Sequence, residues 1–286
     1  MLTSRSVDQR LNLGGAVPVW MRFETEAPVD DILVATSENG FIAIQAKTTA
    51  SPSSDLKSPF GKTISQFVRH WLACRDGDGK RHWNRPLNPN KDRLVLAIGR
   101  QAPATIRVDL TAALRLRAQA GGGTLTQVQE RAFSAYASCV KQAWNSVTSE
   151  AYAPEFPSQL ARFITIFVFD PAGSDRTALL SILGASVTPG SEALTALTAL
   201  EVISGDLMAQ RGGVDLSSLR QLMLTRGVRL DTAPDFQRDV ATLRSHSEAV
   251  AESLKRYEVI ETIEGQSVSI ERDCQPQLLA AALSGS

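Results

Sequence analysis

The sequence has little cysteine, no long apolar run and no net charge, and each of these absences argues against a class of protein. Its 286 residues include three cysteines, Cys74, Cys139 and Cys274, which lie far apart and form no Cys-x-x-Cys pair. A disulfide framework and a zinc knuckle are therefore disfavoured, and a reducing compartment fits best. No apolar run approaches the roughly 20 residues that cross a bilayer, and residues 1–6 lack the hydrophobic stretch of a signal peptide. We therefore expect a soluble, cytoplasmic protein with no membrane partner.

The charges of the chain balance, because Lys plus Arg and Asp plus Glu each number 30. The whole molecule is therefore not a polycation that bulk electrostatics would hold on nucleic acid, and any nucleic-acid site must be local. Apolar residues make up 43% of the chain and charged residues 21%, which excludes a disordered or fibrous protein. The length leaves room for one large domain or two ordinary ones.

The first 170 residues have the pattern of an α/β domain. Five segments alternate or are continuously apolar in the manner of strands, at 17–24, 31–35, 41–47, 94–98 and 163–169. Ser37–Gly40 supplies a hairpin turn between the second and third of these segments. Apolar residues at helical spacing predict helices around 64–72, 110–120 and 125–147. The sheet therefore draws on distant parts of the sequence.

The character of the chain changes beyond residue 189. Helical patterns at 193–210, 216–225 and 234–256 are followed at 258–272 by a hairpin that turns at Glu264–Gln266. Helices followed by a hairpin are the layout of a winged-helix domain, although many small helical domains share it. We predict an α/β domain over residues 1–185 and a mainly helical domain over residues 190–286. The second region contains no acid cluster and no nucleophile–base pair, so we expect it to serve docking or regulation.

Three polar residues are expected to meet at one end of the first predicted hairpin. Side chains two apart in a strand share a face, so Gln45 and Lys47 point the same way, while Ile44 and Ala46 point into the apolar layer. Asp31 opens the antiparallel partner strand, beside the end that carries Lys47. A carboxylate can bind a divalent cation that neutralises a phosphate and activates water, and an ammonium beside it offsets developing charge. This group therefore suits phosphodiester hydrolysis.

These residues carry a resemblance to a nuclease superfamily. Asp31 followed by Ile44-Gln45-Ala46-Lys47 resembles the Asp…(Glu/Gln)-x-Lys core of the restriction-endonuclease-like, or PD-(D/E)xK, nucleases. The Gln form is similar to that of Mrr-type restriction enzymes. Together with Val29-Asp30-Asp31-Ile32, it also resembles the double-stranded DNA endonuclease domain of bacterial antiphage (CD-NTase-associated) effectors.

The resemblance implies a fold, an activity and a role for each residue. The fold would be a restriction-endonuclease-like mixed sheet flanked by helices, and the activity a Mg²⁺- or Mn²⁺-dependent endonuclease that cuts double-stranded DNA in antiphage defence. Asp31 would be a metal ligand, Gln45 would occupy the second metal-ligand position, and Lys47 would be the catalytic lysine. Members of this group often continue into a sensor or ATPase domain, so we expect a homo-oligomer or a separate sensor or ATPase partner.

Gln45 departs from the commoner Glu, and a neutral carbonyl binds Mg²⁺ more weakly than a carboxylate does. Another acid should therefore help, and Glu24 or Glu26 is the nearest candidate. Asp30 remains an alternative to Asp31 as the metal ligand. The departure also keeps a second hypothesis open, in which the fold has lost catalysis and serves as a DNA-binding or protein-interaction module.

The charge distribution supports a local nucleic-acid site. Between Lys47 and Arg107 there are twelve basic and four acidic residues, an excess of eight (12 − 4) in a chain of zero net charge. The loop around Trp83 could grip phosphates and stack on a sugar or base, and the alternative is a solvated loop with Trp83 in the core. The basic residues that we expect to contact nucleic acid are Lys62, Arg69, Lys80, Arg81 and Arg85.

Overall fold

The computed structural model describes residues 9–11, 13, 15–119, 122–188 and 191–230, together with the strands at 259–263 and 266–269. The chain divides into two compact units, Met1–Asp231 and Thr232–Ser286. Among the helices of the described ranges, none combines the length and apolar character that a membrane span requires.

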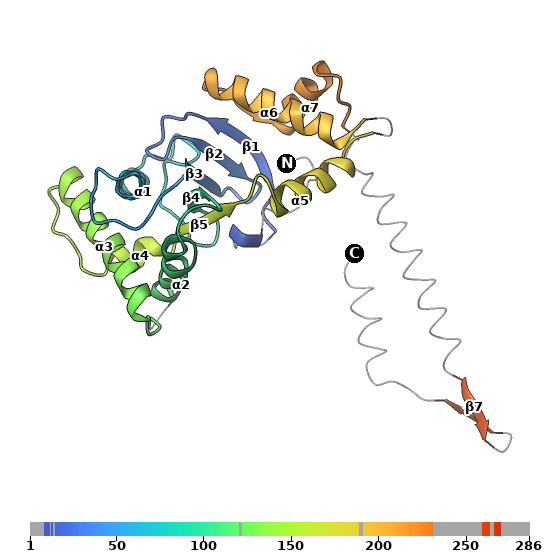
Figure 1. Ribbon diagram of the computed structural model, residues 1–286, viewed down its shortest axis with the longest axis horizontal. Helices are drawn as coiled ribbons and strands as arrows, with labels where there is room; N and C mark the ends of the chain where they lie inside the picture. The colour runs from blue at the N-terminus through green and yellow to red at the C-terminus, as the bar shows by residue number, and fades with distance from the viewer. Residues whose placement is uncertain are drawn as a thin grey trace. The chain divides into compact units, whose positions relative to one another are not determined.

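A six-stranded mixed sheet forms the centre of the first unit (Figure 1), with the strand order β5-β4-β3-β2-β1-β6. Its strands are β1 (Pro18–Phe23), β2 (Ile32–Thr36), β3 (Phe41–Lys47), β4 (Arg93–Gly99), β5 (Ile164–Phe169) and β6 (Gly213–Asp215). β4 pairs in parallel with both β3 and β5, whereas β1, β2, β3 and β6 are joined by antiparallel pairing. The α/β class, the mixed sheet and the five strands expected from the sequence are confirmed.

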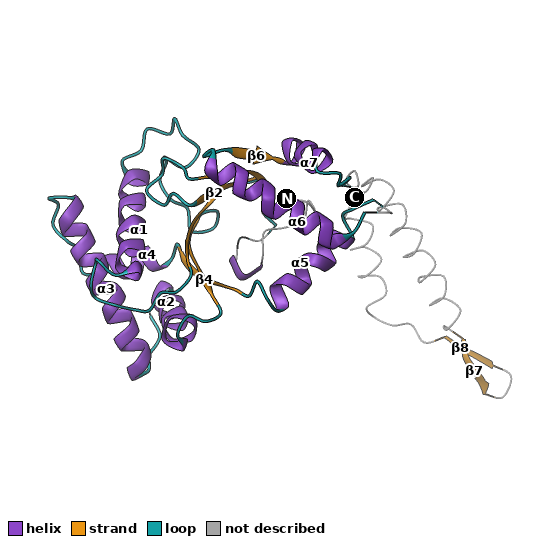
Figure 2. Cartoon of the chain, turned by 45° about the horizontal axis from the view of Figure 1, so that its top comes forward, coloured by secondary structure: helices purple, strands orange, loops and turns teal. Residues whose placement is uncertain are grey.

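Helices cover both faces of this sheet (Figure 2). One face carries α1 (Pro59–Arg75), the π-helix η2 (Thr105–Leu110), α2 (Thr111–Ala118), α3 (Gln127–Val147) and α4 (Phe156–Ala161). The other carries α5 (Ser174–Gly184), α6 (Ala193–Ala209) and α7 (Leu216–Thr225), and the described part of the chain begins with the short 3-10 helix η1 (Gln9–Leu11). The helices expected in these ranges are confirmed, whereas α4 and α5 were not expected.

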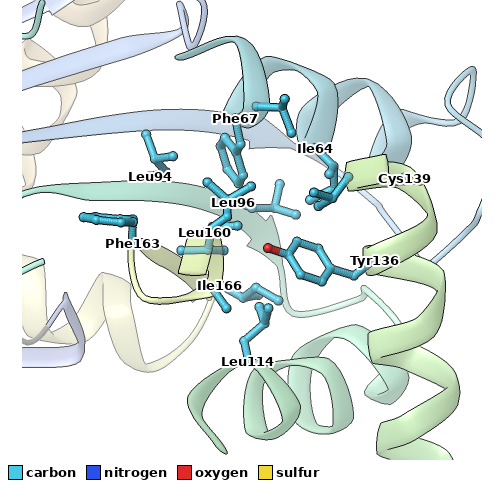
Figure 3. Close-up of a cluster of buried hydrophobic side chains, with 14 of the residues drawn as sticks. Ile64, Phe67, Leu94, Leu96, Leu114, Tyr136, Cys139, Leu160, Phe163 and Ile166 are labelled. Atoms are coloured by element: carbon cyan, nitrogen blue, oxygen red, sulfur yellow. The ribbon is translucent and has the colours of Figure 1, made fainter. Parts of the chain in front are cut away.

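Side chains that alternate along the strands supply two different cores. On one face, Phe41 and Ala43 of β3 are fully buried with Leu94 and Leu96 of β4 beneath α1 to α4. Figure 3 shows this cluster, in which Tyr136 of α3 points toward the sheet. On the other face, a smaller cluster packs residues from the start of the chain against the sheet. Leu11, Leu13 and Ala16 contribute the first group, and Val34, Ile42 and Val95 are the strand residues of this cluster.

The first unit extends further than the boundary that we expected between residues 185 and 190. β6 adds to the edge of the sheet, where Val214 pairs with Met21 of β1, and this pairing joins residues 191–230 to the α/β unit. The helices α5 to α7 nevertheless have a separate apolar cluster, which includes Leu183, Ile203 and Met223. The centre of the sheet comes entirely from residues before 170, and the later segment contributes only an edge strand.

In the second unit the described residues form a two-stranded antiparallel sheet, β7 (Val259–Ile263) and β8 (Gln266–Ser269). Ile263 pairs with Gln266, which confirms the hairpin expected there. The helix expected over 234–256, and with it the winged-helix layout, lies outside the described residues.

Candidate active site

Asp31, Gln45 and Lys47 meet at one end of β3, as the sequence predicted. The Oδ2 atom of Asp31 accepts hydrogen bonds from Gln45 Nε2 at 2.5 Å and from Ala46 N at 2.7 Å. The same oxygen lies 3.9 Å from Lys47 Nζ. This convergence follows from the register of the hairpin, because Ile32 pairs with Ile44 and so places Asp31 opposite Gln45.

The burial of the two faces of β3 differs from our expectation. Gln45 is only 2% exposed and shares its face with the core residues Phe41 and Ala43, whereas Ala46, expected in the apolar layer, is exposed. The reason is that α1 to α4 cover the face that carries Gln45. At the end of the strand the cover is incomplete, and 29% of the Lys47 side chain and 27% of the Asp31 side chain are exposed.

Two oxygen atoms at this site accept no hydrogen bond from the described residues. Gln45 Oε1 is buried without a partner, and both hydrogen bonds of the Asp31 carboxylate go to Oδ2, which leaves Oδ1 open. The orientation of the amide is set by its donation to Asp31, because the flipped amide would place two acceptors together. Carboxylate and carbonyl oxygens are the ligands that Mg²⁺ prefers, with water filling its other positions. The residues present therefore fit a hard divalent cation.

In the part of the chain that the structure describes, no second carboxylate joins this oxygen pair. Within the described ranges there is no group of three or more His, Cys, Asp and Glu side chains that could hold a metal ion. Glu26 forms an ion pair with Arg81 at 2.6 Å, and Asp30 Oδ1 accepts a hydrogen bond from Gln66 of α1. Glu24 touches the site through its backbone, whose N–H donates to the Asp31 carbonyl. Asp31 is therefore the one predicted acid that contacts both Gln45 and Lys47.

A cavity of about 470 Å³ opens beside Lys47. Its lining residues come from the end of β3, the segment that follows it, α1 and α3, and they are Lys47, Leu56, Lys62, Ser65, Gln66, Arg69 and Ser146. The four α1 residues are spaced as one helical stripe on the side opposite the buried Ile64 and Phe67. None of the lining residues is acidic, so the cavity has a positive potential.

Sequence reasoning missed the polar members of this cavity, Ser65, Gln66 and Ser146. A signal for the first two was available, because they fall between Lys62 and Arg69 on the polar side of a helix whose apolar side was recognised. Ser146 belongs to a helix distant in sequence, and no local pattern brings it to α1.

The other basic residues predicted to contact nucleic acid form ion pairs. Lys80 pairs with Asp78 at 2.7 Å and Arg81 with Glu26, while Arg85 binds the fully buried Asp92 through two hydrogen bonds of 2.8 Å. These hydrogen bonds raise the pKa of Arg85 above its usual value. The arginine therefore stabilises the fold at the opposite end of β3 from Lys47.

The loop around Trp83 is also placed differently from our expectation. Trp83 is 9% exposed and packs against His70 with 5.2 Å between ring centroids. The buried indole cannot stack on a base, so this expectation was wrong. The apolar character of the ring explains the outcome, since α1 and β3 offer it a core position beside Phe41 and His70.

No family model, curated protein or solved structure matches this chain. What the site can do therefore follows from its own geometry. One carboxylate is hydrogen-bonded to an amide and lies 3.9 Å from an ammonium beside a cationic cavity, and this combination can bind a cation and a phosphate side by side.

Proposed function

We propose that this protein is a divalent-metal-dependent endonuclease that hydrolyses phosphodiester bonds in DNA. The observation that carries the proposal is the contact of Asp31 Oδ2 with Gln45 Nε2 and its 3.9 Å separation from Lys47 Nζ. An acceptor for a cation and a donor for a phosphate thus lie within the span of one phosphodiester group. The adjoining cationic cavity offers room for the rest of the strand.

Each residue has a distinct role in this proposal. Asp31 Oδ1 and Gln45 Oε1 would hold Mg²⁺ or Mn²⁺, which when bound neutralises phosphate charge and lowers the pKa of a water molecule. The hydrogen bond from Ala46 N fixes the Asp31 carboxylate against the strand, so that it need not reorganise. The partly exposed Lys47 ammonium binds a phosphate oxygen and offsets the charge that develops as the bond to the leaving oxygen breaks.

The surrounding fold supports this assignment by its layout. The β2–β3 hairpin is followed by α1 and then by β4, which pairs in parallel with β3, and this order agrees with a restriction-endonuclease-like fold. The similarity of Val29–Ile32 and Ile44–Lys47 to antiphage endonuclease domains favours a role in prokaryotic antiphage defence. In that role the chain would act as a homo-oligomer or with a sensor or ATPase partner.

A second function is favoured by one specific observation. Among the described residues, Asp31 is the single carboxylate in contact with Gln45 and Lys47, and a cation held by one carboxylate and one amide is held weakly. The same surface would then bind DNA without cutting it.

Incubation of the purified full chain with supercoiled plasmid separates these two functions. The endonuclease is expected to produce nicked and linear plasmid with Mg²⁺ or Mn²⁺ and none with EDTA. An intact plasmid in both metals, together with retention of DNA in a gel-shift assay, would establish the binding module instead.

A further inference from the structure

The cations of the cavity differ from the other basic residues of the segment from Lys47 to Arg107. Most of that segment's positive charge is neutralised by ion pairs or bonded to backbone carbonyls, as with Arg75, Lys80, Arg81, Arg85, Lys91, Arg100 and Arg107. Lys62 and Arg69 are exposed and have no ion-pair or hydrogen-bond partner in the part of the chain that the structure describes. Three cations of this segment have no such partner among the described residues: Lys62 and Arg69 line the cavity, and Lys57 directly follows the lining residue Leu56 in sequence.

The rest of the lining matches the same chemistry. Ser65 and the second amide N–H of Gln66 can donate hydrogen bonds to anionic oxygens, whereas the first amide N–H of Gln66 donates to Asp30 and the Ser146 hydroxyl donates to the Ala143 carbonyl. Leu56 gives the wall one apolar patch, against which the carbon atoms of a sugar can pack. A cavity with cations, neutral donors and no acid suits a phosphodiester better than it suits a metal ion or a basic peptide.

The length of the α1 stripe indicates how many phosphates it can contact. Lys62 and Arg69 are seven residues apart on one helix face, which corresponds to about 10 Å along the helix axis. A DNA strand advances about 3.4 Å along the duplex axis per phosphate, so Lys62 and Arg69 reach different phosphates of one strand. Lys47 also lines this cavity and lies beside Asp31.

We infer that the cavity seats the backbone of one DNA strand and that Lys62 and Arg69 bind phosphates flanking the one cut at Lys47. This inference rests on the proposed function, because that function supplies the cleavage of a phosphate at Lys47. Its consequence is a preference for cleavage within a strand, because a bond at a strand end would lack the flanking phosphates on one side. The strand is positioned by phosphates alone here, so the contacts carry no base sequence.

The test measures DNA affinity against salt for the full chain in EDTA, where no metal-dependent cleavage occurs. A labelled DNA duplex is titrated by fluorescence anisotropy between about 50 and 200 mM salt with wild type, Lys62→Ala, Arg69→Ala and the double variant. Arg115→Ala is the matched control, because Arg115 is an exposed arginine on α2 outside the cavity. All three substitutions lie at exposed side chains, so the four variants are expected to fold as the wild type does.

In each single variant, the negative slope of the log of the binding constant against log salt should become shallower by about 0.9. Each should also bind about tenfold more weakly at about 0.1 M salt. The double variant should lose about twice that slope, and Arg115→Ala should leave it unchanged. Slopes for both cavity variants equal to that of Arg115→Ala, or a wild type that does not bind the duplex, would overturn the inference.

Cleavage of plasmid in Mg²⁺ by the same preparations separates this inference from the proposed function. Reduced slopes without any cleavage would support the cavity as a strand-binding site and remove the nuclease assignment. Cleavage by the wild type with unchanged slopes in both cavity variants would keep the nuclease and overturn the role of the cavity.

Discussion

The two ends of β3 each bring an aspartate to the strand, and the two aspartates have different surroundings. At the Phe41 end, Asp92 has no exposed surface, and its two oxygens accept four hydrogen bonds, from Phe41 N, Asn88 N and both terminal nitrogens of Arg85. At the Lys47 end, Asp31 is partly exposed and only one of its oxygens accepts hydrogen bonds.

This difference separates an ion pair with a structural role from the one that we propose to be reactive. A buried carboxylate with all its acceptor positions filled stabilises the loop and strand that supply its donors. An open carboxylate oxygen next to a buried amide oxygen without a partner costs stability, and such a pair is explained when a ligand supplies the missing contacts. The Asp92 end therefore holds the fold together, and the Asp31 end is the one that we propose to be catalytic.

The largest expected effect is on folding, at the Asp92 end. Asp92→Ala leaves Arg85 without its counter-ion and removes the acceptors of two backbone N–H groups, so the free energy of unfolding should fall by about 3–5 kcal/mol. Asp31→Ala, the same change at the other end, should lower it by about 1 kcal/mol. Urea unfolding followed by circular dichroism measures both values, and equal losses would remove the distinction between the two ends.

Next in size is the effect of Lys47→Ala on cleavage. Loss of an ammonium that stabilises charge in the transition state should lower the rate about 10²–10³-fold. The partly exposed side chain makes one loose ion pair, so the free energy of unfolding should change by less than about 1 kcal/mol. Plasmid cleavage rates in Mg²⁺ give the first value, with Arg115→Ala as a control for loss of an exposed cation. A rate near that of the control would mean that Lys47 takes no part in the reaction.

Acid should have a smaller effect on the free energy of unfolding, through His70, which lies against Phe41 and Trp83. Burial lowers the pKa of His70 from 6.5 to about 3. Below pH 6.5 His70 binds a proton in the unfolded chain but stays neutral in the folded chain. Stability is therefore lost as the pH falls from 6.5 toward 3.

Between about pH 7 and pH 5 this single group should lower the free energy of unfolding by about 2 kcal/mol. His70→Phe keeps a ring in the cluster and removes the titration. Over the same pH interval the free energy of unfolding of this variant should therefore fall by about 2 kcal/mol less than that of the wild type. Urea unfolding at the two pH values measures the difference, and identical losses for wild type and variant would show that His70 is not held neutral.

The smallest of these effects concerns the open oxygens. Gln45→Glu places a second carboxylate beside Asp31, and the extra charge should lower the Mg²⁺ concentration for half-maximal cleavage by about tenfold. Gln210→Glu adds the same charge at an exposed position after α6 and serves as the control. A Gln45→Glu variant that needs more Mg²⁺ than the control would show that the amide does not occupy a ligand position.

The strands and the Asp31–Gln45–Lys47 contact could be predicted because both depend on local pattern. Alternation located β2 and β3, and a short hairpin turn left one register that brings Asp31 opposite Gln45. β6 could not be predicted in this way, because Gly213–Asp215 has too few residues to show alternation and pairs with a strand almost 200 positions earlier. Because β6 pairs with β1, the first unit extends to Asp231.

The burial of Gln45 was missed for a related reason. Period-two alternation says that Gln45 and Lys47 share a face, but it does not say which face the helices cover. Phe41 and Ala43 lie on the same face as Gln45, and their apolar character pointed to the correct answer. The ion pairs of Arg81 and Arg85 depend on loop conformation, which residue counts along the chain do not contain.

The most direct measurement is plasmid cleavage by the wild type and Asp31→Asn side by side in Mg²⁺. The amide keeps the size of the carboxylate and removes its charge, so it should leave the fold intact, as circular dichroism would show, while the charged cation ligand is lost. Conversion of supercoiled plasmid to nicked and linear forms by the wild type alone is the predicted result. Equal cleavage by Asp31→Asn, or cleavage by the wild type that persists in EDTA, would contradict a metal-dependent centre at this end of β3.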